Sequence, residues 1–156
     1  MAIAAENLEP TFDLPGDQPA EQEHALFEEA RRAARHADPM HSHFFVGAAL
    51  ISGKGERYTG ANFENDSYGM TICAERAAIA CAVAAEGHEL EIVAIAVYAE
   101  DAGQRAARTP SPCGACRQVI YQYGPRRGRD TSVIFPVGGD LRRFRMVDLL
   151  AVPFEL

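Results

Sequence analysis

Cys73-Ala74-Glu75 and Pro112-Cys113-Gly114-Ala115-Cys116 bring three cysteines and one carboxylate from two distant segments of a 156-residue chain. Three thiolates occupy three corners of a tetrahedral zinc site and leave the fourth open. Structural zinc sites are usually closed by four protein ligands, whereas a catalytic zinc keeps one position for water. Glu75 lies two residues after a ligand, where it can move protons for that water. The two segments therefore predict a hydrolytic zinc centre.

A closed structural zinc site is one alternative, and it needs a fourth protein ligand. Cys81 is a candidate, but it lies two turns deeper in an apolar helix, so we expect an inert core cysteine. His41 and His43 are also candidates, but they fall in or beside the first predicted strand without the paired spacing of zinc ligands. An open site remains the favoured interpretation.

Redox chemistry and inert buried thiols are two further alternatives. Cys113 and Cys116 have the Cys-x-x-Cys spacing of a thioredoxin-like redox pair. That interpretation leaves Cys73 and Glu75 without a role. Disulfides are not expected, because a chain of this size can bury a stable core without covalent cross-links and should meet reducing conditions.

Composition indicates an ordinary globular protein. Its apolar fraction is 47% and its charged fraction 24%, both typical of globular domains. No apolar stretch is long and uncharged enough to span a bilayer. The first residues, with Glu6 and Glu9, lack the basic and apolar regions of a secretory signal. We therefore expect a cytoplasmic protein without a membrane partner.

The net charge of −7 argues against nucleic acid as the main partner, because nucleic-acid binders concentrate positive charge to neutralise phosphates. A small, weakly charged substrate is more compatible. One exception is a group of arginines that could form a phosphate-binding patch, although a solvated surface is the simpler explanation: Arg126, Arg127, Arg129, Arg142, Arg143 and Arg145.

Hydrophobic periodicity predicts nine elements in the order αββαβαββα. Residues 1–20 are rich in Pro, Glu and Asp without a period, which predicts a mobile tail, and residues 21–156 are expected to form one domain. The elements are a helix from Glu21 to about Ala37, strands at Phe44–Ile51 and Glu56–Ala61, a buried helix at Cys73–Glu86, a strand at Ile92–Ala99, a helix from Ser111 to about Tyr123, strands at Ser132–Pro136 and Leu141–Arg145, and a short helix at Met146–Leu150. This order predicts an α/β fold, a three-layer α/β/α sandwich with a mixed, roughly five-stranded sheet.

The second cysteine segment is expected at a helix start. Ser111 is a suitable N-cap and Pro112 a suitable first helical residue. That assignment places Cys113 in the first turn, with Cys116 three residues later on the same face. The dipole of a helix N-terminus favours thiolate over thiol.

The first cysteine segment has the same character, because Cys73 lies at or near the start of its own helix. Three thiolates and one Zn²⁺ carry a net charge of −1, which hinders ionisation of a bound water. Arg76 lies one turn after Cys73 and is the cation that we expect to offset this charge.

With these residues described, the chain resembles the small homotetrameric cytidine deaminases from about Glu21 to Phe154. The zinc segments alone are typical of the wider superfamily. Together with the Asn-x-Glu-Asn segment, they are specific for the deaminases that act on nucleosides. Four segments carry the resemblance: Ser42-His43-Phe44-Phe45-Val46-Gly47-Ala48-Ala49, Asn62-Phe63-Glu64-Asn65, Cys73-Ala74-Glu75-Arg76 and Pro112-Cys113-Gly114-Ala115-Cys116-Arg117-Gln118.

The resemblance implies a metal centre with one Zn²⁺ per chain, held by Cys73, Cys113 and Cys116. Glu75 is then the acid–base group, which accepts a proton from water and delivers protons to the cytosine ring and the departing amine. The implied reaction is the hydrolytic deamination of cytidine and 2′-deoxycytidine to the uracil nucleosides with release of ammonia, a step of pyrimidine salvage.

The resemblance also implies substrate contacts. Asn62 and Glu64 match the pair that binds the ribose 3′-hydroxyl, and Phe44 matches the aromatic residue that packs on the pyrimidine. Ala74 is a further expected contact. Phe154 matches a phenylalanine that reaches into the site of a neighbouring subunit, which implies a homotetramer with shared active sites.

Three residues near the expected pocket depart from the family pattern. Met40 and His41 stand where Tyr, sometimes preceded by Pro, is usual, and Phe45 stands where Pro is common. A deaminase for a modified or antibiotic aminopyrimidine nucleoside, similar to blasticidin-S deaminases, is therefore an alternative. A nucleotide or polynucleotide deaminase and a non-catalytic zinc protein are the others.

Overall fold

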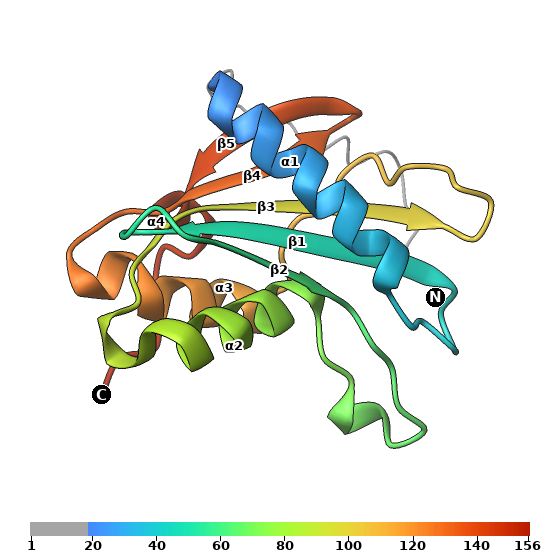
Figure 1. Cartoon of the computed structure of the whole chain (residues 1–156), viewed down its shortest axis with the longest axis horizontal. Helices are drawn as coiled ribbons and strands as arrows, with labels where there is room; N and C mark the ends of the chain where they lie inside the picture. Colours follow the sequence, from blue (N-terminus) through green and yellow to red (C-terminus); the bar gives the residue numbers. More distant parts are fainter. Residues whose placement is uncertain (1–18) are drawn as a thin grey trace, which may run out of the picture.

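Five strands form one mixed sheet in the order β2-β1-β3-β4-β5 (Figure 1). The structure is a computed structural model that describes residues 19–156. β1 pairs antiparallel with both β2 and β3, β3 pairs parallel with β4, and β4 pairs antiparallel with β5. The strands are β1 (Phe44–Ser52), β2 (Arg57–Ala61), β3 (Ile92–Asp101), β4 (Ser132–Val137) and β5 (Asp140–Arg145).

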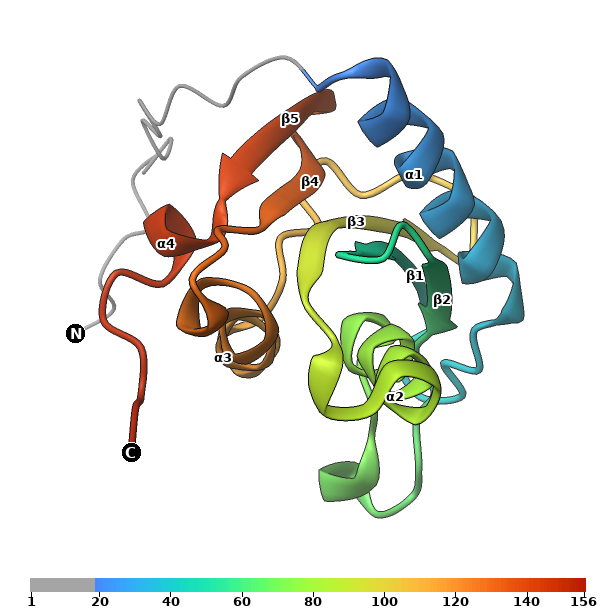
Figure 2. The same cartoon turned by 60° about the vertical axis from the view of Figure 1, so that its left-hand side comes forward.

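Helices cover both faces of this sheet. Figure 2 shows α1 on one side, with α2 and α3 next to each other on the opposite side. The predicted three-layer α/β/α sandwich with a five-stranded mixed sheet is confirmed, in the predicted element order. The predicted tail covers residues 1–20, of which 1–18 lie outside the described residues, while Ala20 is the N-cap of α1. The helices are α1 (Glu21–Ala33), α2 (Ala74–Glu86), α3 (Gly114–Tyr123) and α4 (Met146–Leu149), with 3₁₀ turns η1 (Ala34–His36), η2 (Tyr68–Met70), η3 (Gly87–Glu89) and η4 (Pro125–Arg127).

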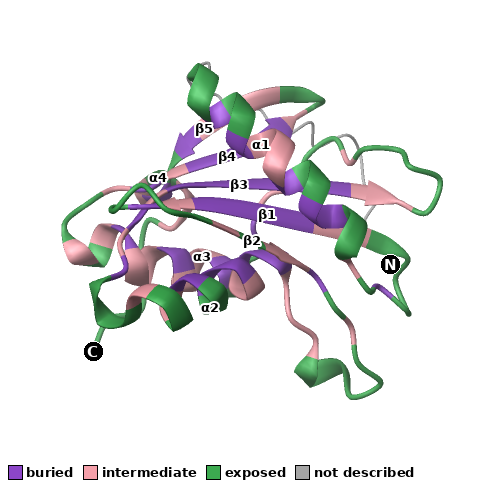
Figure 3. Ribbon diagram, in the orientation of Figure 1, coloured by how far each residue is buried: buried purple, intermediate pink, exposed green. Residues whose placement is uncertain are grey.

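The apolar run of β1 serves both layers, because successive side chains of a strand point to opposite faces. Ala48 and Leu50 pack in the cluster that includes α2. Ala49, between them, packs with Leu26 and Ala30 of α1. Figure 3 shows β1 and β3 buried along most of their length. A strand enclosed in this way must be apolar on both sides, which explains its uninterrupted hydrophobic sequence.

Two glycines set how closely the helices approach the sheet. A Cβ atom on Gly47 would lie 2.0 Å from the backbone oxygen of Ala30 in α1. A Cβ atom on Gly60 would lie 2.3 Å from the backbone nitrogen of Ala78 and 2.6 Å from the backbone oxygen of Ala74 in α2. Because backbone atoms cannot move aside as a flexible side chain can, the absence of a side chain at Gly60 fixes the position of α2 on the sheet.

The outer face of α2 differs from the prediction of a helix buried all round. The side facing the sheet is buried, but the opposite side, including Cys81, is exposed to solvent. The expectation that Cys81 is a core cysteine is therefore wrong. An apolar pattern indicates that a face is suited to be covered, but it does not indicate that the same chain covers it. The exposed residues are Ala80, Cys81, Ala84 and Ala85.

None of the helices in residues 19–156 combines the length and the apolar character that crossing a bilayer requires.

Gly60→Ala is expected to lower the free energy of unfolding by about 1–3 kcal/mol, the usual range for overpacking a tight contact. Gly69→Ala is the matched control, because a Cβ atom there meets no atom within 4 Å. Urea denaturation of both variants measures the difference. Equal stability of the two variants would contradict the role of Gly60 in placing α2.

Candidate metal centre

Two helices begin at the same point beneath the sheet, and each begins at a cysteine. Cys73 is the N-cap of α2, with extended backbone angles φ −70° and ψ 151°. Cys113 is the N-cap of α3, with φ −66° and ψ 165°. Their carbonyl oxygens accept the first helical hydrogen bonds, from Ala77 at 3.0 Å and Arg117 at 2.9 Å. Both N-cap sulfurs therefore lie where the positive ends of two helix dipoles meet.

The start of α3 lies two residues later than predicted. Ser111 does not cap the helix, because its hydroxyl accepts a hydrogen bond from the Arg117 guanidinium at 2.7 Å. The same guanidinium donates to the carbonyl oxygen of Pro112 at 2.9 Å. Arg117 thus holds the segment before the helix in an extended form. Cys113 becomes the cap, and Cys116 takes the place in the first turn.

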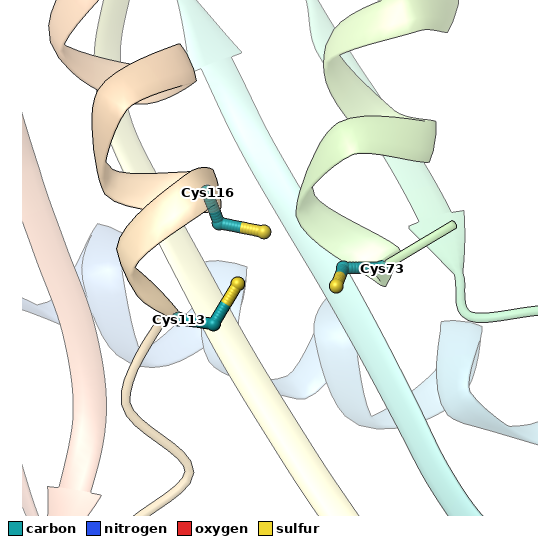
Figure 4. Close-up of side chains that lie close together, drawn as sticks. All are labelled: Cys73, Cys113 and Cys116. Atoms are coloured by element: carbon teal, nitrogen blue, oxygen red, sulfur yellow. The ribbon is translucent and has the colours of Figure 1, made fainter. Parts of the chain in front are cut away.

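The three cysteines converge, as Figure 4 shows. Their sulfur atoms all lie within 4.8 Å of one another, and within residues 19–156 they form the only group of three or more possible metal ligands of this kind. Neither His41 nor His43 belongs to it.

This donor set fits zinc. A tetrahedral zinc ion binds sulfur at about 2.3 Å, which places bound sulfurs roughly 3.8 Å apart. The observed spacing needs only small side-chain movements to reach that geometry. Because three sulfurs leave one tetrahedral position open, the cluster matches the open type of site. The predicted zinc cofactor agrees with this geometry.

Contacts within the cluster polarise its thiols. Hydrogen bonding from Cys116, and then from Arg76, lowers the pKa of the Cys73 thiol to about 5. The same pairing, together with burial, raises the pKa of Cys116. One thiolate thus forms readily and disfavours a second beside it. A divalent cation removes that conflict, because it stabilises all three sulfurs as thiolates.

Arg76, the cation predicted from the sequence, lies beside Cys73. One guanidinium nitrogen donates to the carbonyl oxygen of Thr71 at 3.0 Å and lies 3.9 Å from the sulfur of Cys73. Its contact with Cys73 raises the pKa of Arg76. A fixed positive charge at a ligand sulfur reduces the negative charge of a three-thiolate site.

Glu75 is buried beside the cluster. Its side chain is 4% exposed, and burial raises the pKa of its carboxyl group. A carboxyl group with a raised pKa takes up and returns protons near neutral pH more readily than an exposed one. Glu75 also lines the adjoining pocket together with Cys73 and Cys113, so it lies where the metal site borders a space for substrate.

The pocket has a volume of about 480 Å³, which accommodates a nucleoside-sized ligand. Of the predicted site residues, the pocket brings together both N-cap cysteines, Glu75 and four expected substrate contacts. Those contacts are Phe44, Asn62, Glu64 and Ala74. Cys116 completes the sulfur cluster behind this wall, and its side chain is fully buried.

An extended segment presents Asn62 and Glu64 to the pocket. Phe63 forms bridges to Asp38 on one side and to Ile72 on the other. Because side chains alternate along extended backbone, Asn62 and Glu64 face the pocket together, while Phe63 points outward and is 46% exposed.

Hydrogen bonds hold both side chains in place. The Asn62 amide accepts from the Val46 nitrogen at 2.8 Å and donates to the Phe44 oxygen at 3.0 Å. One carboxylate oxygen of Glu64 accepts from the backbone nitrogens of His41 at 2.7 Å and Ser42 at 3.0 Å. Bonds from Ser42 and His41 lower the pKa of Glu64, so it is a carboxylate near neutral pH. The Ser42 side chain also bonds this carboxylate, and Glu64 lines the pocket.

Phe154 is the predicted substrate contact that the structure does not place in the pocket. Its side chain is 68% exposed, and it is absent from the pocket wall. The Gln118 amide holds its backbone at two points instead.

Sequence reasoning assigned no role to Ser42, Arg117 or Gln118. Arg117 and Gln118 bond backbone groups of the C-terminal segment, and Ser42 bonds the Glu64 carboxylate 22 positions later. No local pattern indicates such contacts. Their positions inside the motif segments were the one available signal.

A family model supports the geometric interpretation. The cytidine and deoxycytidylate deaminase zinc-binding region matches residues 20–128. The chain belongs to this family. The match includes both cysteine segments and the Asn62 to Glu64 segment.

Individual relatives agree. A cytidine deaminase from Halalkalibacterium halodurans is 42% identical over 130 residues, which are 83% of this chain and 91% of the relative. The crystal structure of a cytidine deaminase from Burkholderia pseudomallei matches with a TM-score of 0.71 and 40% identity, over 84% of this chain and 98% of that one. A blasticidin-S deaminase from Bacillus cereus is 32% identical over 110 residues, which are 70% of this chain and 76% of the relative.

Replacing each cluster cysteine in turn by alanine is expected to remove most of the bound zinc, because two sulfurs bind the ion far more weakly than three. Cys81→Ala is the matched control, since Cys81 lies outside the cluster on the exposed face of α2. Zinc per chain, measured by atomic emission on purified protein, should stay near one in the control. Full zinc content in Cys73→Ala would contradict the assignment.

Proposed function

We propose that this chain catalyses the zinc-dependent hydrolytic deamination of cytidine and 2′-deoxycytidine to uridine and 2′-deoxyuridine, with release of ammonia. The observation that carries the proposal is the position of the buried Glu75, beside a three-sulfur cluster on the wall of a pocket of nucleoside size. The family match and the cytidine deaminase relatives support it.

Cys73, Cys113 and Cys116 hold the metal in this proposal, and Arg76 offsets their charge. Zinc, when bound there, acts as a Lewis acid that lowers the pKa of water toward neutrality. Glu75 would take one proton from this water and pass it to N3 of the cytosine ring as the water oxygen adds to C4. Glu75 would then take the second proton of that oxygen and pass it to the amine, which leaves as ammonia when its bond to C4 breaks. One carboxyl group serves both as base and as acid because it is buried next to the cluster and the ring position alike.

Four residues orient the nucleoside. Asn62 and Glu64 bind the ribose 3′-hydroxyl, because an amide and a carboxylate together serve a hydroxyl as donor and acceptor. Phe44 is 39% exposed and lines the pocket, so its ring has a free face for the pyrimidine. Ala74 is fully buried at the helix start and forms part of the wall without crowding it.

The positions of the residues that depart from the family pattern favour cytidine over an antibiotic as the substrate. Met40, His41 and Phe45 are absent from the pocket wall. The imidazole of His41 instead lies 3.3 Å from the Asp66 carboxylate and contacts the Tyr68 ring edge to face. The substitutions thus alter the outer rim, while the interior of the pocket is unchanged by them.

A small substrate is also favoured over a polynucleotide, because the arginine group forms internal contacts. Arg145 pairs with Asp130 at 2.8 Å, and Arg142 lies 4.0 Å from Asp140. Arg127 stacks over the ring of Tyr123 at 5.0 Å. Side chains already paired with acids or rings neutralise few phosphates.

The homotetramer with shared active sites belongs to this proposal as well. The outer face of α2 exposes a stripe of small apolar residues that suits close packing against another copy (Figure 3). Phe154 projects from the chain outside its own pocket, as a residue that completes a neighbour's site would. A cytoplasmic role in pyrimidine salvage completes the proposal.

Purified protein is expected to release ammonia from cytidine and 2′-deoxycytidine, and not from CMP, adenosine or blasticidin S. Glu75→Gln should lower kcat by about 10²- to 10⁴-fold, the usual contribution of an acid–base group, with zinc retained. Glu86→Gln, at the other end of α2, is the matched control and should retain activity.

Each other outcome has a defined meaning. Turnover of blasticidin S without turnover of cytidine would establish the antibiotic alternative. Zinc binding without ammonia release from any nucleoside would indicate a non-catalytic zinc protein.

A further inference from the structure

One amide side chain of α3 holds the backbone of Phe154, in the C-terminal segment, by two hydrogen bonds. The Gln118 Nε2 donates to the carbonyl oxygen of Phe154 at 2.9 Å, and the Phe154 nitrogen donates to the Gln118 Oε1 at 2.9 Å. The pairing imitates the two hydrogen bonds of an antiparallel strand pair. It therefore fixes both the position and the orientation of the Phe154 backbone.

Neighbouring contacts tie the same segment to the same helix. Arg117 donates to the carbonyl oxygen of Leu149 at 3.0 Å, and the Tyr121 hydroxyl bonds the Glu155 carboxylate. Cys113, the N-cap of α3, and Cys116 in its first turn both belong to the metal cluster. This helix therefore connects the cluster to the C-terminal segment. Gln118 is the residue among them that holds Phe154 itself.

The result of this attachment is an aromatic ring that the described residues leave mostly exposed. With its backbone held against α3, the Phe154 side chain remains 68% exposed. In Figure 1 the C-terminus and the loop between β2 and α2 lie at opposite ends of α2. A held backbone with a free ring is the arrangement expected of a residue presented to another molecule, because an unattached terminus loses more conformational entropy on binding.

We propose that Gln118 is a positioning residue, which holds the Phe154 backbone so that the ring enters the nucleoside pocket of a second copy of this chain. The inference rests on the proposed function, since it requires a deaminase whose sites are completed by a neighbouring copy. Gln118 itself touches no substrate. Its effect reaches the reaction through Phe154 and only in the neighbour's site.

The chemistry of the side chain makes the inference testable. An amide both donates and accepts, so Gln118→Ala removes both bonds, and Gln118→Glu removes the donated bond. Gln122→Ala is the matched control: Gln122 is the same residue type one turn later on α3, and its side chain bonds Arg126 rather than the C-terminal segment.

The first experiment separates substrate binding from chemistry. Gln118→Ala is expected to raise KM for cytidine about five- to tenfold, the loss expected for one or two hydrogen bonds, with kcat changed less than twofold and zinc content unchanged. Gln118→Glu should fall between Gln118→Ala and the wild type, and Gln122→Ala should match the wild type. In a Phe154→Ala background, Gln118→Ala should have no further effect on KM, because both changes remove the same ring contact.

The second experiment tests action on the neighbour. Gln118→Ala and Glu75→Ala chains are co-expressed with different tags, and the mixed oligomers are purified. A site on a Gln118→Ala chain then keeps its own Glu75 and can receive Phe154 from an intact neighbour. By random assortment about a quarter of all sites combine both features, and these should turn over cytidine with the KM of the wild type.

Several results would overturn the inference. A kcat loss or zinc loss in Gln118→Ala would assign it to the metal centre of its own chain. Mixed oligomers in which every active site shows the raised KM would likewise assign the effect of Gln118 to its own chain. Unchanged KM in Gln118→Ala with an active wild type would refute the inference alone, whereas an inactive wild type would refute the proposed function.

Discussion

The convergence of two helix N-termini on one point beneath the sheet is the constraint on which the site depends. α2 and α3 each begin with a cysteine as N-cap, so both helices direct unpaired N–H groups and positive dipole ends toward the same three sulfurs. Three thiolates this close repel one another, as the opposed pKa shifts of Cys73 and Cys116 indicate. Zinc, the helix dipoles and Arg76 together offset that repulsion, and each of them requires the two helices to start at this place.

The rest of the fold serves this convergence. The absence of a side chain at Gly60 lets α2 approach the sheet closely, and Arg117 holds the chain before α3 extended until Cys113. The pocket forms where these helix starts meet the end of β1 and the segment of Asn62 and Glu64. Glu75, as the second residue of α2, is thereby buried beside the sulfurs on the pocket wall. Position in the helix, burial and raised pKa are consequences of one placement.

Much of this arrangement could be predicted because the deciding patterns are local. The element order follows from hydrophobic periodicity, and the cysteine spacing indicates a metal cluster. Two expectations were wrong for physical reasons. Ser111 has the chemistry of an N-cap, but its hydroxyl bonds Arg117 instead. Cys81 lies on an apolar helix, yet within residues 19–156 its face is left exposed. Gln118 could not be found from sequence, because its partner is the backbone of a residue 36 positions later.

The central claim is an open zinc site with three sulfur ligands, and X-ray absorption at the zinc edge of the purified full-length chain tests it most directly. The account predicts three sulfurs at about 2.3 Å and one oxygen at about 2.0 Å from the metal. The Cys81→Ala variant should give the same spectrum. Four sulfurs, or a histidine nitrogen in the fourth position, would show a closed structural site and contradict the account.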